Sequence, residues 1–123
     1  MKLLYKISAY LLVLLGIVHI GFSPLFFGQF GMDVLWFAGT GLGFVFLGNL
    51  NIIVITSKKA AFYIVAVTSN ILGVLLAAVT ASMLASTQAY IALAITILAL
   101  IGSFGEYIRL IKKIANTNFT VRF

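Results

Sequence analysis

The chain alternates four long apolar segments with short polar junctions. The apolar segments cover about residues 3–22, 32–55, 60–84 and 88–113. Each is long enough to cross a hydrocarbon core about 30 Å thick, which takes roughly 20 helical residues. Barrel strands would alternate strictly over about 10 residues, and the continuous runs of Leu, Ile, Val and Ala do not. The pattern predicts an all-α polytopic membrane protein, a four-transmembrane-helix bundle forming a single domain, residues 1–123.

All Lys and Arg residues lie at alternate junctions of this pattern. They are Lys2, Lys6, Lys58, Lys59, Arg109, Lys112, Lys113 and Arg122. The other two junctions, about residues 23–31 and 85–87, contain neither residue type. Because basic loops stay on the cytoplasmic side of a membrane, this distribution predicts that both termini and the 58–59 turn are cytoplasmic. A bacterial inner membrane is the default location.

Composition excludes a soluble monomer, because 63% of the residues are hydrophobic and only 8% are charged. The formal net charge of +6 comes from scattered residues at one face. It therefore indicates contact with anionic lipids at the cytoplasmic face and not a nucleic-acid surface. The lipid bilayer is the predicted partner, and a homo-oligomer or a membrane-protein partner is an additional candidate.

The first apolar segment also has features of a signal peptide. Lys2 and Lys6 precede an apolar run that ends near Gly21 and Ser23, which form a small-residue site. Pro24 directly after this site disfavours cleavage. We therefore expect the segment to be retained as a helix.

Metal and thiol chemistry is not predicted. The chain has no cysteine, one histidine and two carboxylates, which is a poor ligand set for zinc. No cofactor is predicted either. A proton-coupled transporter would need a carboxylate near the middle of a span, and none of the four segments carries one.

Small and polar residues recur at helical spacing inside the segments, as expected for helix contacts in lipid. The glycines predicted to pack against other helices are Gly39, Gly43, Gly48 and Gly73. Segment 32–55 carries small or polar groups on several sides, with Asn49 opposite its main polar face. We expect this segment at the centre of the bundle, or in contact with both its own bundle and a second copy.

A set of polar and aromatic residues is predicted to line an outward-facing pocket that binds a ligand. Its members are His19, Asp33, Trp36, Thr40, Asn70 and Thr96. In one interpretation His19 transfers a proton beside Asp33, because histidine is the usual proton-transferring side chain and a carboxylate would orient the ring. In the other, His19 packs and bonds a backbone carbonyl where Pro24 interrupts the helix.

Residues near the segment ends have simpler interpretations. Glu106 lies three residues before Arg109, which predicts an exposed interfacial ion pair. Four tyrosines near the ends fit an aromatic belt at the membrane surface, namely Tyr5, Tyr63, Tyr90 and Tyr107.

At His19, Pro24, Trp36, Gly39, Gly41, Gly48 and Asn49 the chain resembles small uncharacterised four-helix bacterial inner-membrane proteins, DoxX-like in layout. The resemblance covers the first two segments only. It implies a four-helix bundle of the cytoplasmic membrane, and it carries over no catalytic residue.

Three functions remain open from the sequence. The favoured hypothesis is a non-catalytic bundle that binds a ligand, a lipid or a partner through its inward polar stripes. The second is an oligomeric channel or carrier for a small neutral solute, with a path along Thr40, Asn70, Thr96 and Ser103. The third is a membrane enzyme acting on a lipid or quinone-like substrate, with His19 as acid or base.

Overall fold

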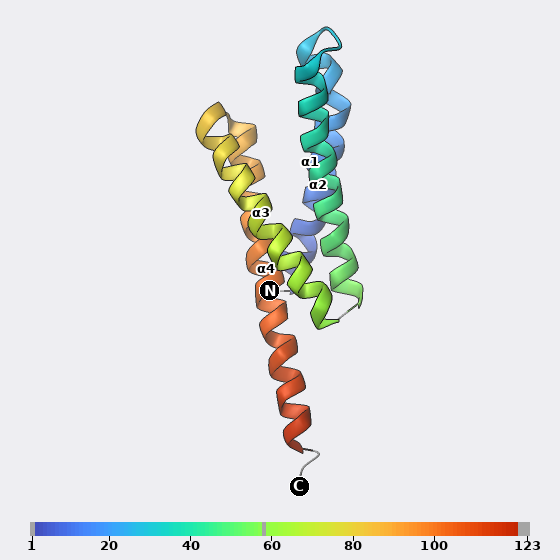
Figure 1. Ribbon diagram of the computed structural model, residues 1–123, viewed down its shortest axis with the longest axis vertical. Coiled ribbons are helices and arrows are strands. Elements are labelled where there is room, and N and C mark those ends of the chain that lie inside the picture. The colour runs from blue at the N-terminus through green and yellow to red at the C-terminus, as the bar shows by residue number, and fades with distance from the viewer. Residues whose placement is uncertain (1, 58, 121–123) are drawn as a thin grey trace.

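The computed structural model describes residues 2–57 and 59–120, with side chains described up to residue 116. Within these ranges the chain forms four helices: α1 (Lys2–Phe27), α2 (Met32–Ser57), α3 (Ala60–Leu84) and α4 (Thr87–Thr120) (Figure 1). All four are long and apolar enough to cross a membrane. The predicted all-helical class and the four spanning-length helices are therefore confirmed.

Two helices extend beyond their predicted ends. α1 continues through Pro24 to Phe27, because a proline removes only one backbone hydrogen bond and the next turn is still formed. Gly28, with φ +63°, then ends the helix, and its N–H donates to the Pro24 carbonyl over 3.3 Å. α4 continues to Thr120 although its last residues are polar. An apolar run predicts only the part of a helix that lies in lipid. It does not predict how far the helix continues into polar residues.

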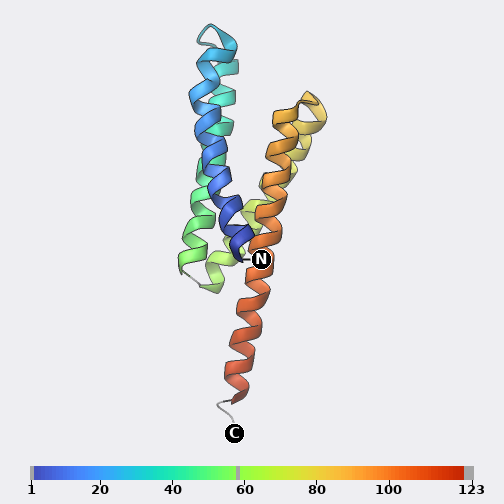
Figure 2. The same ribbon diagram turned by 180° about the vertical axis from the view of Figure 1, so that it is seen from behind.

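The helices form two antiparallel hairpins, with α1 along α2 and α3 along α4. Figures 1 and 2 show the hairpins in contact near the N-terminus and diverging toward the turns at 28–31 and 85–86. The C-terminal part of α4 extends past the other helices. We call the end of the bundle that carries Lys2, Lys59 and Arg109 the basic end.

The core lies at the basic end, where all four helices meet. Tyr5, Val54, Tyr63 and Ala66 form a buried cluster, and Tyr107 of α4 packs against it. Elsewhere most large apolar side chains point outward, as Phe46 and Leu72 do with 68% and 67% of their surface exposed. An outward apolar surface of this kind is what four lipid-facing helices require.

Glycines allow α1 and α2 to approach closely along one line. A Cβ added at Gly48 would lie 2.8 Å from the Ala9 carbonyl oxygen, and one at Gly41 would lie 2.8 Å from that of Gly16. The two pairs are seven residues apart on both helices, which is about two helical turns. The backbones are therefore nearly in contact at two levels.

The glycines predicted to pack divide into two groups. Gly48 lies against α1, and a Cβ at Gly73 of α3 would meet Leu47 Cδ2 of α2 at 2.8 Å. A Cβ at Gly39 or Gly43 would meet nothing within 4 Å. Within the described chain, Gly39 and Gly43 thus make no close helix contact, and α2 does not lie at the centre of the bundle. A glycine in the sequence shows that another helix can approach closely at that position. It does not show that another helix packs there.

Candidate functional site

One polar residue from each helix joins a hydrogen-bond network inside the bundle. The Tyr5 hydroxyl donates to Asn51 Oδ1 over 2.8 Å. Asn51 and Asn70 then exchange two bonds, each 2.9 Å long, between the Nδ2 of one and the Oδ1 of the other. Asn70 Nδ2 also donates to Ser103 Oγ over 3.0 Å. We call Tyr5, Asn51, Asn70 and Ser103 the four-helix network.

The network members are fully buried, and their remaining polar atoms are satisfied by backbone carbonyls. Asn51 Nδ2 donates to the Leu47 carbonyl over 2.7 Å, and Ser103 Oγ donates to that of Leu100 over 3.0 Å. Among the described residues, no buried side-chain N or O lacks a partner. An unpaired polar group in hydrocarbon costs several kcal/mol, so this network sets the register of the hairpins.

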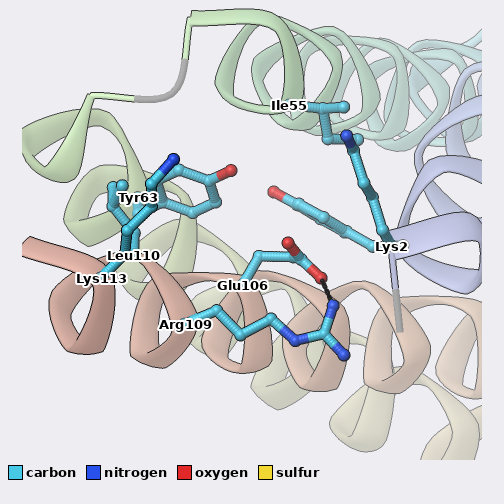
Figure 3. A pocket seen from close by; sticks show the side chains of 8 residues that line it. Lys2, Ile55, Tyr63, Glu106, Arg109, Leu110 and Lys113 are labelled. Atoms are coloured by element: carbon cyan, nitrogen blue, oxygen red, sulfur yellow. Dashed lines mark hydrogen bonds and ion pairs between the residues drawn. The ribbon is translucent and has the colours of Figure 1, made fainter. Parts of the chain in front are cut away.

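A pocket of about 230 Å³ lies at the basic end of the bundle. We call it the basic pocket, and it is lined by Lys2, Tyr5, Ile55, Tyr63, Glu106, Arg109, Leu110 and Lys113. Figure 3 shows the Tyr63 ring and the Glu106 carboxylate directed into the same space. Tyr5 belongs to both features, since its hydroxyl bonds Asn51 while the residue lines the pocket.

The ion pair between Glu106 and Arg109 forms as predicted, but its two partners differ in exposure. Arg109 Nη1 lies 2.8 Å from Glu106 Oε1. The Arg109 side chain is 59% exposed, whereas that of Glu106 is only 13% exposed because it faces the basic pocket. The expectation of an exposed pair therefore holds for the arginine and not for the carboxylate.

The chemistry of the basic pocket is that of an anion site with apolar walls. Three basic residues outnumber one carboxylate, and that carboxylate already has a cationic partner. Ile55 and Leu110 supply apolar surface, and Tyr63 supplies a hydroxyl. In the described part of the chain, no three His, Cys, Asp or Glu side chains come together in a group that could hold a metal ion.

His19 packs in an aromatic cluster between α1 and α2. Its ring stacks on Phe37 at 4.6 Å between centroids and meets the edge of Phe44 at 5.6 Å. His19 Nδ1 lies 3.0 Å from the Leu15 carbonyl, to which it donates. No hydrogen bond or ion pair joins His19 to Asp33 within residues 2–57. The ring packs and bonds a backbone carbonyl, as in the packing interpretation, but the carbonyl is that of Leu15 and α1 is not interrupted at Pro24.

The other predicted ligand-binding residues lie in separate places. Trp36 is 71% exposed, and the exposed Thr40 donates to the Trp36 carbonyl over 3.0 Å. Thr96 is buried and bonds two carbonyls of its own helix, at 3.0 and 2.9 Å. Asn70 belongs to the four-helix network. His19 lies about 21 Å along α1 from Tyr5, a member of that network, at 1.5 Å per residue. The structure therefore does not gather the six residues around one pocket.

Sequence reasoning missed how Tyr5 and Ser103 are used and that Lys2, Tyr63 and Lys113 share a pocket. Tyr5 and Tyr63 were assigned to an aromatic belt, which is the usual place for tyrosines near span ends. The available signal was depth: in α1, α2 and α3 the network residue lies in the half nearer the basic end, and Ser103 lies near the middle of α4. Depth alone does not say which helix faces meet.

Comparison of the chain with protein-family models, with curated proteins and with solved structures found no match. The DoxX-like resemblance stays a prediction. The four-helix network and the basic pocket are therefore the observations on which a function has to be argued.

Proposed function

We propose that the chain is a multi-pass protein of a bacterial inner membrane, with both termini and the 58–59 turn in the cytoplasm. An even number of crossings returns a chain to the side on which it starts, so the four spanning-length helices of the described chain support this orientation. The described basic side chains all belong to the helix ends and the turn on that side. Cysteines introduced at Ser57 and Gln29 test this orientation. In intact cells a membrane-impermeant thiol reagent should label Gln29→Cys, and Ser57→Cys only after permeabilisation.

We further propose that the bundle is a non-catalytic binding protein whose ligand is the anionic head group of a membrane lipid, held in the basic pocket. One observation carries this proposal: Lys2, Tyr63 and Lys113 line the same pocket at the basic end. With the proposed orientation this end lies at the cytoplasmic leaflet. Basic pockets between helices on that side suit anionic lipid head groups.

The size and walls of the pocket favour a head group over a whole small molecule. Its volume of about 230 Å³ is below the range of roughly 300–1,000 Å³ typical of drug-sized ligands. Apolar residues Ile55 and Leu110 line the same pocket. We expect the glycerol end of the bound lipid to pass along these two residues toward the hydrocarbon. A phosphate is expected beside the basic residues that line the pocket, Lys2, Arg109 and Lys113.

Native mass spectrometry of the protein extracted with its own lipids tests the proposal. The pocket variant Lys2→Gln/Lys113→Gln is compared with Lys6→Gln/Lys112→Gln, which removes the same charge from the same two helices outside the pocket. The pocket variant should retain several-fold less phosphatidylglycerol, and the control should retain it as the native chain does. If both variants lost the same amount of phosphatidylglycerol, the lipid would be held only by general attraction to the basic surface. That result would overturn the proposed binding in the pocket.

A further inference from the structure

One face of α2 has the spacing of a helix-packing seam but is exposed in the described part of the chain. Its residues follow steps of four, three, four, three and four: Leu35, Gly39, Leu42, Phe46, Asn49 and Ile53. All six are exposed. We call this face the α2 seam. Apolar positions repeating in this way form the contact line of left-handed helix pairs.

The α2 seam is turned away from both contacts that α2 makes inside the bundle. Gly41 and Gly48 face α1, and Asn51 faces the four-helix network. At about 100° per residue, the centre of the seam lies about 120° from Gly41 and about 160° from Asn51. A second molecule can therefore cover the seam without disturbing the bundle.

Asn49 makes exposure of the seam to lipid energetically unfavourable, because its side-chain amide has no hydrogen-bond partner among the described residues. Asn51 and Asn70, which lie inside the bundle, are hydrogen-bonded through both their amide nitrogens and their amide oxygens. No hydrogen bond of the Asn49 side chain is present among residues 2–57 and 59–116. The exposed hydroxyl group of Thr56 is satisfied by carbonyls of its own helix. A side-chain amide has two donor hydrogens and an acceptor oxygen, and helix carbonyls offer nothing to the oxygen.

The depth of Asn49 places this unpaired amide inside the hydrocarbon. It lies eight residues before Ser57, or about 12 Å from that end of a helix about 39 Å long. A polar group at this depth requires a partner, because water is absent and lipid tails offer no hydrogen bonds.

We propose that a second copy of the chain covers the α2 seam, so that two α2 helices pack in parallel about a two-fold axis and Asn49 bonds Asn49. The inference rests on the orientation proposed above, which gives every copy the same direction in the membrane. A residue on the axis then meets its own counterpart at the same depth. An asparagine amide is complementary to itself, and a single one in an apolar seam fixes register. Gly39 allows the backbones to approach at the other end of the seam.

Disulfide cross-linking in native membranes tests the dimer directly, because the chain has no cysteine of its own. Single cysteines are placed at Leu42 and Phe46 in the seam and, as controls, at Leu72 and Leu76 of α3, which are also exposed. Mild oxidation should give a dimer at the two seam positions and none at the two α3 positions. Such cross-links form only where the same residue of two copies meets, so they report parallel packing.

The role of the amide is tested by Asn49→Leu, with Thr68→Leu on the exposed face of α3 as the control. Asn49→Leu should raise the dissociation constant of the dimer by about 3- to 30-fold in micelles, and Thr68→Leu should leave it unchanged. Monomers in membranes, cross-links of equal yield on α3, or a seam cysteine captured by a different protein would each overturn the proposal. If the native chain retained no phosphatidylglycerol while its seam cysteines still cross-linked, the result would count against the basic pocket and not against the dimer.

Discussion

Asn51 of α2 and Asn70 of α3 exchange two side-chain hydrogen bonds, each 2.9 Å long, and so connect one hairpin to the other. The pair adjoins the buried cluster at the basic end, since Asn51 accepts a hydrogen bond from Tyr5 of that cluster. Because the two amides satisfy each other in both directions, a shift of either hairpin along its axis breaks both bonds together. The pair therefore defines the register of the bundle.

The network predicts an order of stability losses. Asn51→Leu removes the acceptor of the Tyr5 hydroxyl and a donor to Asn70, so it should cost about 2 kcal/mol of unfolding free energy. Asn70→Leu should cost only about 1 kcal/mol, because Asn51 keeps its bonds to Tyr5 and to the Leu47 carbonyl. Reversible unfolding in mixed micelles measures both values. The reverse order would show that Asn70 holds the network.

The glycine line between α1 and α2 predicts a contrast between two substitutions of equal size. Gly48→Leu places side-chain atoms where the Ala9 carbonyl and Val13 N already lie, each 2.8 Å from an added Cβ. It should cost at least about 3 kcal/mol or abolish folding, because backbone cannot move aside. Gly43→Leu, whose Cβ meets nothing within 4 Å, should change stability by less than about 1 kcal/mol. Thermal unfolding in micelles compares the two, and equal losses would contradict the helix arrangement.

Apolar run length predicted the helices because a membrane span is set by one dimension, the thickness of the hydrocarbon. The end of α1 was not predicted, since Pro24 is a frequent helix boundary in water but is tolerated within apolar helices. The sequence predicts Asn70 among the residues that line a pocket, whereas the structure buries its side chain between helices, where it bonds Asn51 and Ser103. The spacing of residues along one helix shows which side of that helix is polar or small. It does not show which face of which other helix packs against that side.

The site illustrates the same limit. Lys2, Tyr63 and Glu106 are far apart in the sequence, and each has an ordinary interpretation as an interfacial residue. Their common space arises only where α1, α3 and α4 meet at the basic end (Figure 3). Conversely, His19 and Asp33 are near in sequence and of suitable chemistry, yet no bond joins them in the described chain.

The position of His19 predicts that it and Asp33 act independently. His19→Ala should cost about 1–2 kcal/mol of stability by removing its contacts with Phe37 and Phe44. Asp33→Asn should cost about 0.5 kcal/mol or less, through the N-terminus of α2. The double variant should equal the sum within about 0.5 kcal/mol. A coupling well above this in unfolding experiments would show the contact that the enzyme hypothesis requires.

The position of Glu106 in the basic pocket predicts how lipid binding responds when the carboxylate of this residue is removed. Glu106→Gln removes the negative charge nearest the proposed phosphate and releases Arg109, so retention of phosphatidylglycerol in native mass spectra should rise. Stability should fall by about 1 kcal/mol or less, because the arginine of the pair is largely exposed. Asp33→Asn is the matched control, since it makes the same charge change at the opposite end of the bundle. If both variants raised retention equally, net charge alone would govern lipid binding and the pocket would have no part in it.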